Sequence, residues 1–160
     1  AELAYWMKNV MPYTEGNDGN IRWWRMKGAG QNWNNDLPPA RFIKMTTYNL
    51  KRDNSSDFFR FWRNNVKLQK SLGYTGASGV FMLESGGQAY QVMEVEGYNS
   101  HAEGKGAFKN PDVNYVEEYN KMFGWRSHRN DQAAFNASIE QWGIIVETAE
   151  LKPEMSSKLK

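Results

Sequence analysis

Two histidines, His101 and His128, are the only side chains of this chain whose unperturbed pKa lies near neutrality. Either imidazole could act as a general base or as an axial ligand to haem. The plainer alternative places His101 at the N-terminus of a helix and His128 in a polar loop, both in solvent. A metal site would need nearby carboxylates such as Glu94, Glu96 or Glu103, and the sequence lacks the ligand spacing of a His-Glu-x-x-His motif. We therefore expect no metal and no other cofactor, and we take His101 as the candidate base.

Tyrosine and asparagine side chains on predicted strands could orient a ligand beside that base. Tyr48, Tyr90 and Tyr98 come close together if their two strands pair in the centre of a sheet, and their hydroxyls could then bond a polar group on an apolar ligand. The alternative is that these tyrosines are simply half-buried, as is common on strands. The candidate catalytic residues are His101, Tyr48, Asn49 and Tyr90. The candidate ligand contacts in the same pocket are Trp62, Met93 and Tyr98.

Tryptophans are concentrated in the first forty residues. Exposed tryptophans stack on sugar rings, so Trp23, Trp24 and Trp33 could form a surface for glycans or for another partner. The alternative is that these large apolar side chains hold the segment against the rest of the protein. The sequence thus leaves a second function open, a non-catalytic binding module.

The elements that must position these residues are predicted most clearly between residues 41 and 98. Residues 41–51 are rich in β-branched and aromatic side chains, which favours a strand. Residues 57–72 carry apolar side chains at three- and four-residue spacing, which predicts a helix that ends at Gly73. Two further strands, 75–85 and 88–98, flank a Gly-Gly pair suited to a tight hairpin turn.

The remaining predicted elements are a strand at 21–27, a helix after Pro111, a helix at 132–142 closed by Gly143, and a last strand at 144–151. From residue 41 the order is β-α-β-β-α-(α)-β, which is the split βαβ order of a ferredoxin-like α+β fold with helices on one face of an antiparallel sheet. We expect residues 1–40 to be an N-terminal extension packed on a domain of residues 41–152. Residues 153–160 are expected to form a polar tail.

This pattern resembles the dimeric α+β barrel superfamily, which includes antibiotic-biosynthesis-monooxygenase-like domains. The resemblance covers residues 41–151. It rests on the strand that runs into an aromatic helix (Phe42 to Leu72), on the strand ending QVMEVEGYNSHAE, and on the Lys109-Asn-Pro-Asp112 break before another aromatic helix. The extension at 1–39 and the helix at 132–142 depart from a minimal domain of this type.

The resemblance implies a homodimer whose two sheets pair into a barrel, with a pocket for a small apolar or aromatic ligand between sheet and helices. It also implies that any chemistry is of the cofactor-independent oxygenase or acid/base type. Haem-degrading members of the superfamily use an Asn, a Trp and a His, onto which Asn49, Trp62 and His101 can be loosely mapped, so haem binding is a third interpretation.

Composition limits the other possibilities. The formal net charge is +2, and Lys and Arg are dispersed along the chain, which argues against a nucleic-acid partner. The absence of cysteine excludes disulfides and thiol chemistry. No apolar run is long enough to span a membrane. The chain begins Ala-Glu-Leu, as a secreted or periplasmic protein would after signal cleavage, although a recombinant chain could begin in the same way.

Overall fold

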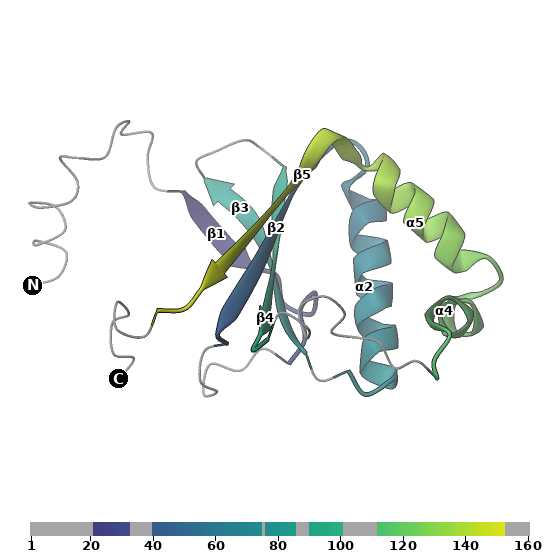
Figure 1. Cartoon of the computed structure of the whole chain (residues 1–160). Coiled ribbons are helices and arrows are strands. Elements are labelled where there is room, and N and C mark those ends of the chain that lie inside the picture. Colours follow the sequence, from purple (N-terminus) through teal and green to yellow (C-terminus); the bar gives the residue numbers. More distant parts are fainter. Residues whose placement is uncertain (1–20, 33–39, 75, 86–89, 101–111, 153–160) are drawn as a thin grey trace, which may run out of the picture.

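The computed structural model describes residues 21–32, 40–74, 76–85, 90–100 and 112–152. Within these residues the strands are β1 (Arg22–Arg25), β2 (Phe42–Leu50), β3 (Ala77–Ser85), β4 (Gln91–Tyr98) and β5 (Ile139–Glu150). The helices are α2 (Ser55–Ser71), α4 (Tyr115–Phe123) and α5 (Ser127–Ala137). The strands form one sheet, and the three helices lie on the same side of it (Figure 1). This confirms the predicted α+β class with an antiparallel sheet.

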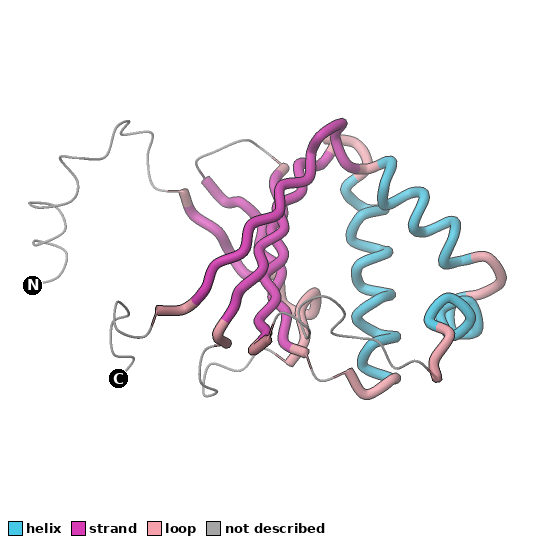
Figure 2. The backbone as a smooth tube through the Cα atoms, viewed as in Figure 1, coloured by secondary structure: helices cyan, strands magenta, loops and turns pink. Residues whose placement is uncertain are grey.

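The order of strands across the sheet is β1-β3-β4-β2-β5, and every neighbouring pair is antiparallel. β2 lies between β4 and β5, and the tube in Figure 2 shows these strands as one twisted layer. β1 comes from the segment expected to pack on the domain as an extension, and it forms one edge of this sheet. Within the described part of the chain, no helix is both long and apolar enough to cross a membrane.

The pairing of β2 with β4 decides which side chains face the helices. Tyr48 lies opposite Val92, and Thr46 lies opposite Glu94. Opposed residues of an antiparallel pair share a face, and alternate residues along a strand point the same way. Because Tyr48 contacts Phe58 of α2, all of these side chains lie on the face that the helices cover.

An aromatic core fills the space between the sheet and the helices. Phe58 is fully buried, and its ring stacks on that of Phe135 from α5 with centroids 4.8 Å apart. Tyr48 meets Phe58 edge to face at 5.2 Å, and Trp62 stacks on Phe58 at 5.8 Å. Stacked and edge-to-face pairs at these separations are the geometries that aromatic rings prefer. The predicted apolar stripe of the 57–72 helix is therefore confirmed as its buried face.

The opposite face of the sheet is covered by no helix or strand among the described residues. We call it the open face. Its apolar side chains are Ile43, Met45, Phe81, Met93, Val95 and Ile145, and its polar side chains include Thr47, Asn49, Gln91 and Glu147. Most of these side chains are half-buried by their neighbours in the sheet, and Ile145 at the edge is 50% exposed. The open face is thus a mainly apolar surface on the side of the sheet opposite the core.

The helix predicted at 132–142 is present over residues 132–137, as part of α5, but its predicted end is wrong. α5 ends at Ala137, and β5 begins at Ile139, so Trp142 lies in a strand. Trp142 has a φ of 61° and stands where the pairing of β5 with β2 is interrupted, between Ile144 opposite Tyr48 and Ile139 opposite Leu50. The apolar spacing in this stretch is compatible with a helix, but pairing with β2 prevails. The predicted polar loop at His128 is also wrong, because this residue lies in the first turn of α5.

Candidate functional site

A cavity of about 150 Å³ lies between the helix-facing side of the sheet and α2. Polar side chains from both layers line it, among them Gln31, Gln69, Ser78, Glu94 and Glu96. Its apolar wall consists of Phe61, Trp62 and Val66 from α2. A cavity of this volume holds several waters or an organic group about the size of benzene.

Regular spacing in two elements builds this cavity. Glu94 and Glu96 are alternate residues of β4, so both point toward α2. Trp62, Val66 and Gln69 are separated by three or four residues, so they share one face of α2. The site therefore follows from strand and helix periodicity once these two elements lie against each other.

Glu94 is a half-buried carboxyl group in this cavity. Burial raises the pKa of Glu94 to about 8, and the negative charge of Glu96 acts in the same direction. The charge of Lys44 and a hydrogen bond with Tyr48 oppose this shift. Glu94 is consequently protonated in most molecules at neutral pH, and it titrates close to the physiological range.

Tyr48 and Lys44 complete the electrostatics around Glu94. Burial raises the pKa of Tyr48, and the nearby Glu94 and Glu96 raise it further, so its hydroxyl stays protonated and donates to Glu94. Lys44 Nζ donates to Glu96 Oε2 at 3.0 Å. Burial alone would lower the pKa of Lys44, but the hydrogen bond and charge of Glu96 raise it in sum. Lys44 thus forms its ion pair with Glu96, and it acts on Glu94 through its charge.

Gln31 contributes an unusual acceptor to the same cavity. Its backbone is fixed to β3, because Gln31 N donates to Ser78 O at 3.0 Å and Ser78 N donates to Gln31 O at 2.9 Å. The residue is only 3% exposed, and Gln31 Nε2 donates to Gln69 Oε1 at 2.5 Å. Gln31 Oε1 receives no hydrogen bond from any residue that the structure describes. An unpaired buried acceptor costs roughly 1–3 kcal/mol.

Of the residues predicted from sequence, Tyr48 and Trp62 meet at this site. Trp62 lines the cavity, Tyr48 hydrogen-bonds Glu94, and the two rings pack at 6.0 Å. The other predicted pocket residues among those that the structure describes lie elsewhere. Tyr98 is opposite Phe42 at the far end of β4, and Tyr90 precedes that strand with 45% of its surface exposed. The three tyrosines therefore do not converge.

Asn49 and Met93 lie on the open face, away from Trp62. The Oδ1 atom of Asn49 accepts a hydrogen bond from Gln91 Nε2 at 2.8 Å. Trp23 and Trp24 are consecutive residues of β1, so their side chains point to opposite faces of the sheet. His101 and Trp33 lie outside the described residues.

The sequence analysis did not identify two residues of this site, Glu94 and Gln31, as parts of a ligand pocket. Glu94 was considered only as a metal ligand, although strand alternation already placed it on the side of Val92 and so toward the core. Gln31 gave no signal, because its position depends on a bridge to Ser78, far along the chain. Among the described residues, no cluster of three or more His, Asp or Glu side chains could hold a metal ion.

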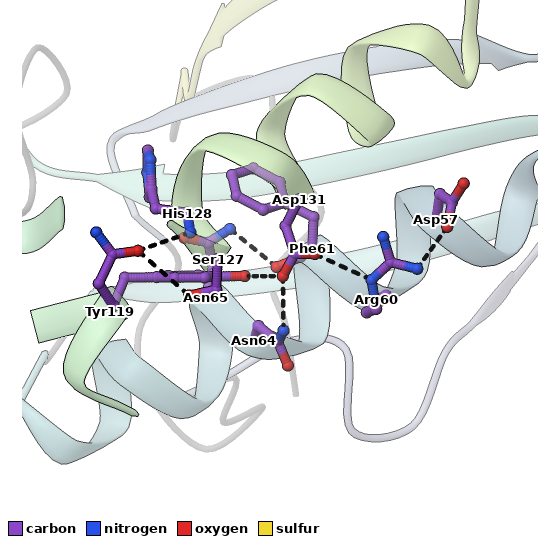
Figure 3. A network of polar contacts seen from close by, with 10 residues as sticks. Asp57, Arg60, Phe61, Asn64, Asn65, Tyr119, Ser127, His128 and Asp131 are labelled. Carbon is purple, nitrogen blue, oxygen red and sulfur yellow. Dashed lines mark hydrogen bonds and ion pairs between the residues drawn. The ribbon is translucent and has the colours of Figure 1, made fainter. Parts of the chain in front are cut away.

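A second polar cluster joins the helices to one another (Figure 3). Its centre is Asp131 of α5, whose carboxylate accepts hydrogen bonds from three groups of α2 and α4: Arg60 Nε at 3.1 Å, Asn64 Nδ2 at 3.1 Å and Tyr119 Oη at 2.8 Å. His128 packs edge-on against Tyr119, with ring centroids 5.2 Å apart. Burial lowers the pKa of His128, and the charge of Asp131 offsets this only in part. These contacts fix the helices and leave His128 away from the cavity.

No protein-family model matches the sequence, and no curated protein shows significant similarity to it. The fold and the cavity therefore define the molecule, as a small α+β protein with one antiparallel sheet and a half-buried carboxyl group between that sheet and a helix.

Proposed function

We propose that this protein binds a small molecule in the cavity between β4 and α2, with Trp62 as its aromatic contact and Glu94 as its acid/base group. The observation that carries the proposal is that the half-buried Glu94 carboxyl group lines a cavity next to Tyr48 and forms no ion pair with any described residue. Withdrawing a carboxyl group from water without an ion-pair partner is costly to a fold, and carboxyl groups with a strongly raised pKa concentrate at functional sites.

If the protein is an enzyme, this site supports cofactor-independent acid/base chemistry. A group with a pKa near the working pH can both give and take a proton during turnover, and Glu94 meets that condition. Tyr48 would hold the carboxyl group in place through its hydroxyl hydrogen bond. His101 stays a candidate base from the sequence.

Filling the cavity tests the binding function. Small aromatic and polar fragments should shift the NMR signal of the Trp62 indole N–H. A Val66→Phe variant should lose these shifts because its larger side chain occupies the cavity. Val116→Phe, on the exposed surface of α4, is the matched control. Fragments that leave the Trp62 signal unchanged in the wild type, or that bind equally well to folded Val66→Phe protein, would contradict the proposal.

We also propose that the sheet is ferredoxin-like with β1 added at one edge. β2 and β3, joined by α2, are both antiparallel to β4, which lies between them. Two parallel strands joined through a helix and separated by one inserted strand make a split βαβ unit. This arrangement supports the resemblance to the dimeric α+β barrel superfamily, in its monooxygenase-like branch.

The same resemblance leads us to propose a homodimer formed through the open face. Five strands spaced at about 4.8 Å, each about eight residues long, give a face of about 24 Å by 27 Å. Two such faces would bury roughly 1,300 Å² in total, which is within the range of stable interfaces. The apolar character of Met45, Phe81 and Met93 suits pairing with a second copy.

A further inference from the structure

We infer that the ligand of this cavity is a small organic cation that carries N–H donors, such as an amidinium, guanidinium or primary ammonium compound. The inference rests on the proposed function, because it assigns the chemistry of the ligand to that same cavity. It follows from the hydrogen-bond donors and acceptors of the cavity wall, and from the wall's charge.

Three N–H donors of the cavity wall are already used by the protein. Trp62 Nε1 donates to Ala29 O at 3.0 Å. Gln31 Nε2 donates to Gln69 Oε1, and Asn65 Nδ2 donates to Phe61 O at 2.9 Å. A ligand that presents only acceptors would find these three groups engaged, and it could not supply the hydrogen bond that Gln31 Oε1 lacks.

The acceptors, in contrast, are in excess. Gln31 Oε1 is buried and receives no hydrogen bond from any described residue. The carboxyl group of Glu94 holds one described donor, the Tyr48 hydroxyl, and has further lone pairs. A ligand that donates N–H bonds to Gln31 and Glu94 would satisfy both, whereas an apolar ligand would leave Gln31 Oε1 unpaired.

The charged groups of the cavity wall indicate whether the ligand is a cation or an anion. Two carboxyl groups, Glu94 and Glu96, line the cavity, and the described lining contains no cationic side chain. The neighbouring cation that acts on Glu94, Lys44, is engaged with Glu96. Phe61 and Trp62 supply aromatic rings, which attract cations. When Glu94 is ionised, an anion would meet repulsion here, and a cation would be paired by Glu94.

Pairing with a cation requires Glu94 to be ionised, so binding should release a proton at neutral pH. The charged and titratable groups facing Glu94 are Glu96 on its own strand and Lys44 and Tyr48 on β2. Lys44 and Tyr48 both keep their protons through neutral pH, because their pKa values are raised. Glu94 is therefore the group that titrates, and affinity should rise about tenfold between pH 7 and pH 9.

Three isosteric probes test the inference. Benzamidinium, benzamide and benzoate share a ring and a planar substituent but carry a positive, a neutral and a negative group. Isothermal titration calorimetry and the Trp62 indole N–H signal should show that benzamidinium binds at least tenfold more tightly than benzamide. Benzoate should not bind. Benzamidinium stays charged at pH 7 and pH 9, so its gain in affinity between them reports on the protein.

Variants tie the effect to Glu94. Glu94→Gln keeps the side-chain shape and should lose both the preference for benzamidinium and its pH dependence. Glu84→Gln removes an exposed carboxylate of β3 and should leave both unchanged. Benzamide binding as tightly as benzamidinium would overturn the inference while leaving the binding function intact. Tighter binding of benzoate than of benzamidinium would also overturn the inference alone. Failure of all three probes to shift the Trp62 signal would overturn both proposals.

Discussion

At the scale of single residues, Glu94 should make the stability of the protein depend on pH in an unusual direction. Its pKa in the folded protein, about 8, exceeds the ordinary value of 4.5 that applies to the unfolded chain. The folded state therefore holds this proton more tightly. The resulting stabilisation is complete below about pH 4.5 and is lost as the pH rises through 8.

Glu94→Gln mimics the protonated carboxyl group at every pH. The free energy of unfolding of this variant should equal that of the wild type at pH 4 and exceed it by up to about 5 kcal/mol at pH 9. Urea unfolding at pH 4, 7 and 9 measures the difference. The free energy of unfolding of Glu84→Gln should depend on pH in the same way as that of the wild type, because the Glu84 carboxylate is exposed. If Glu94→Gln is less stable than the wild type at pH 9, Glu94 is ionised in the fold and the assignment is wrong.

The sequence predicted those residues of the site whose place follows from local periodicity. Trp62 belongs to the stripe of a strongly amphipathic helix, and Tyr48 alternates with neighbours on a strand, so both were found. Gln31 reaches the cavity through backbone hydrogen bonds to Ser78. No local pattern encodes such a pairing between distant segments, which is why Gln31 escaped sequence analysis.

At the scale of elements, α5 is held to α2 by hydrogen bonds that converge on Asp131. Asp131→Ala would leave Arg60, Asn64 and the buried Tyr119 hydroxyl without this acceptor. We expect a loss of roughly 2–3 kcal/mol in the free energy of unfolding, because buried polar groups would be left unpaired. Chemical denaturation followed by far-UV circular dichroism gives this value.

Asp57 provides the matched control for Asp131. It pairs with the same Arg60, but within one turn of α2 and at the surface. Exposed pairs of this kind contribute at most about 1 kcal/mol, so Asp57→Ala should cost much less than Asp131→Ala. Equal losses in the two variants would show that Arg60 pairing, and not the convergence on Asp131, stabilises the helices.

The boundary between α5 and β5 shows where element prediction reaches its limit. Gly143 resembled a helix terminator in the sequence, but in the structure it lies in β5 against the backbone of Asn49. A Cβ atom there would come within 2.9 Å of Asn49 O and 2.7 Å of Glu140 O. The glycine is thus needed for a close approach of two strands, a tertiary requirement that a search for helix caps misreads.

At the scale of the whole molecule, the sequence predicted most elements and the class of fold, because each element has its own periodicity. The addition of β1 beside β3 was not predicted. That pairing joins Trp24 to Met82 and so depends on segments far apart in the chain. The 21–27 strand was recognised by its composition, but composition does not say which edge of a sheet a strand will join.

The open face gives the prediction that concerns the whole molecule. Met93 lies near its centre, opposite Thr47 on one side and Phe81 on the other. If two copies pair through this face, the wild type should have twice the mass of the chain by sedimentation equilibrium. Met93→Lys should give a folded monomer, because a lysine in the centre of an apolar interface would have to be desolvated. Val116→Lys, on the exposed surface of α4, should stay dimeric.

Two results would contradict the proposed dimer. One is a wild type that remains monomeric at concentrations well above those of ordinary assays. The other is a Met93→Lys protein that is still dimeric, since the interface would then lie elsewhere. Circular dichroism distinguishes loss of the dimer from loss of the fold, because Met93 is only half-buried in the single chain and a lysine can extend its charged end into water. The cavity lies on the other side of the sheet, so the monomeric variant should still bind benzamidinium, with an affinity that rises between pH 7 and pH 9.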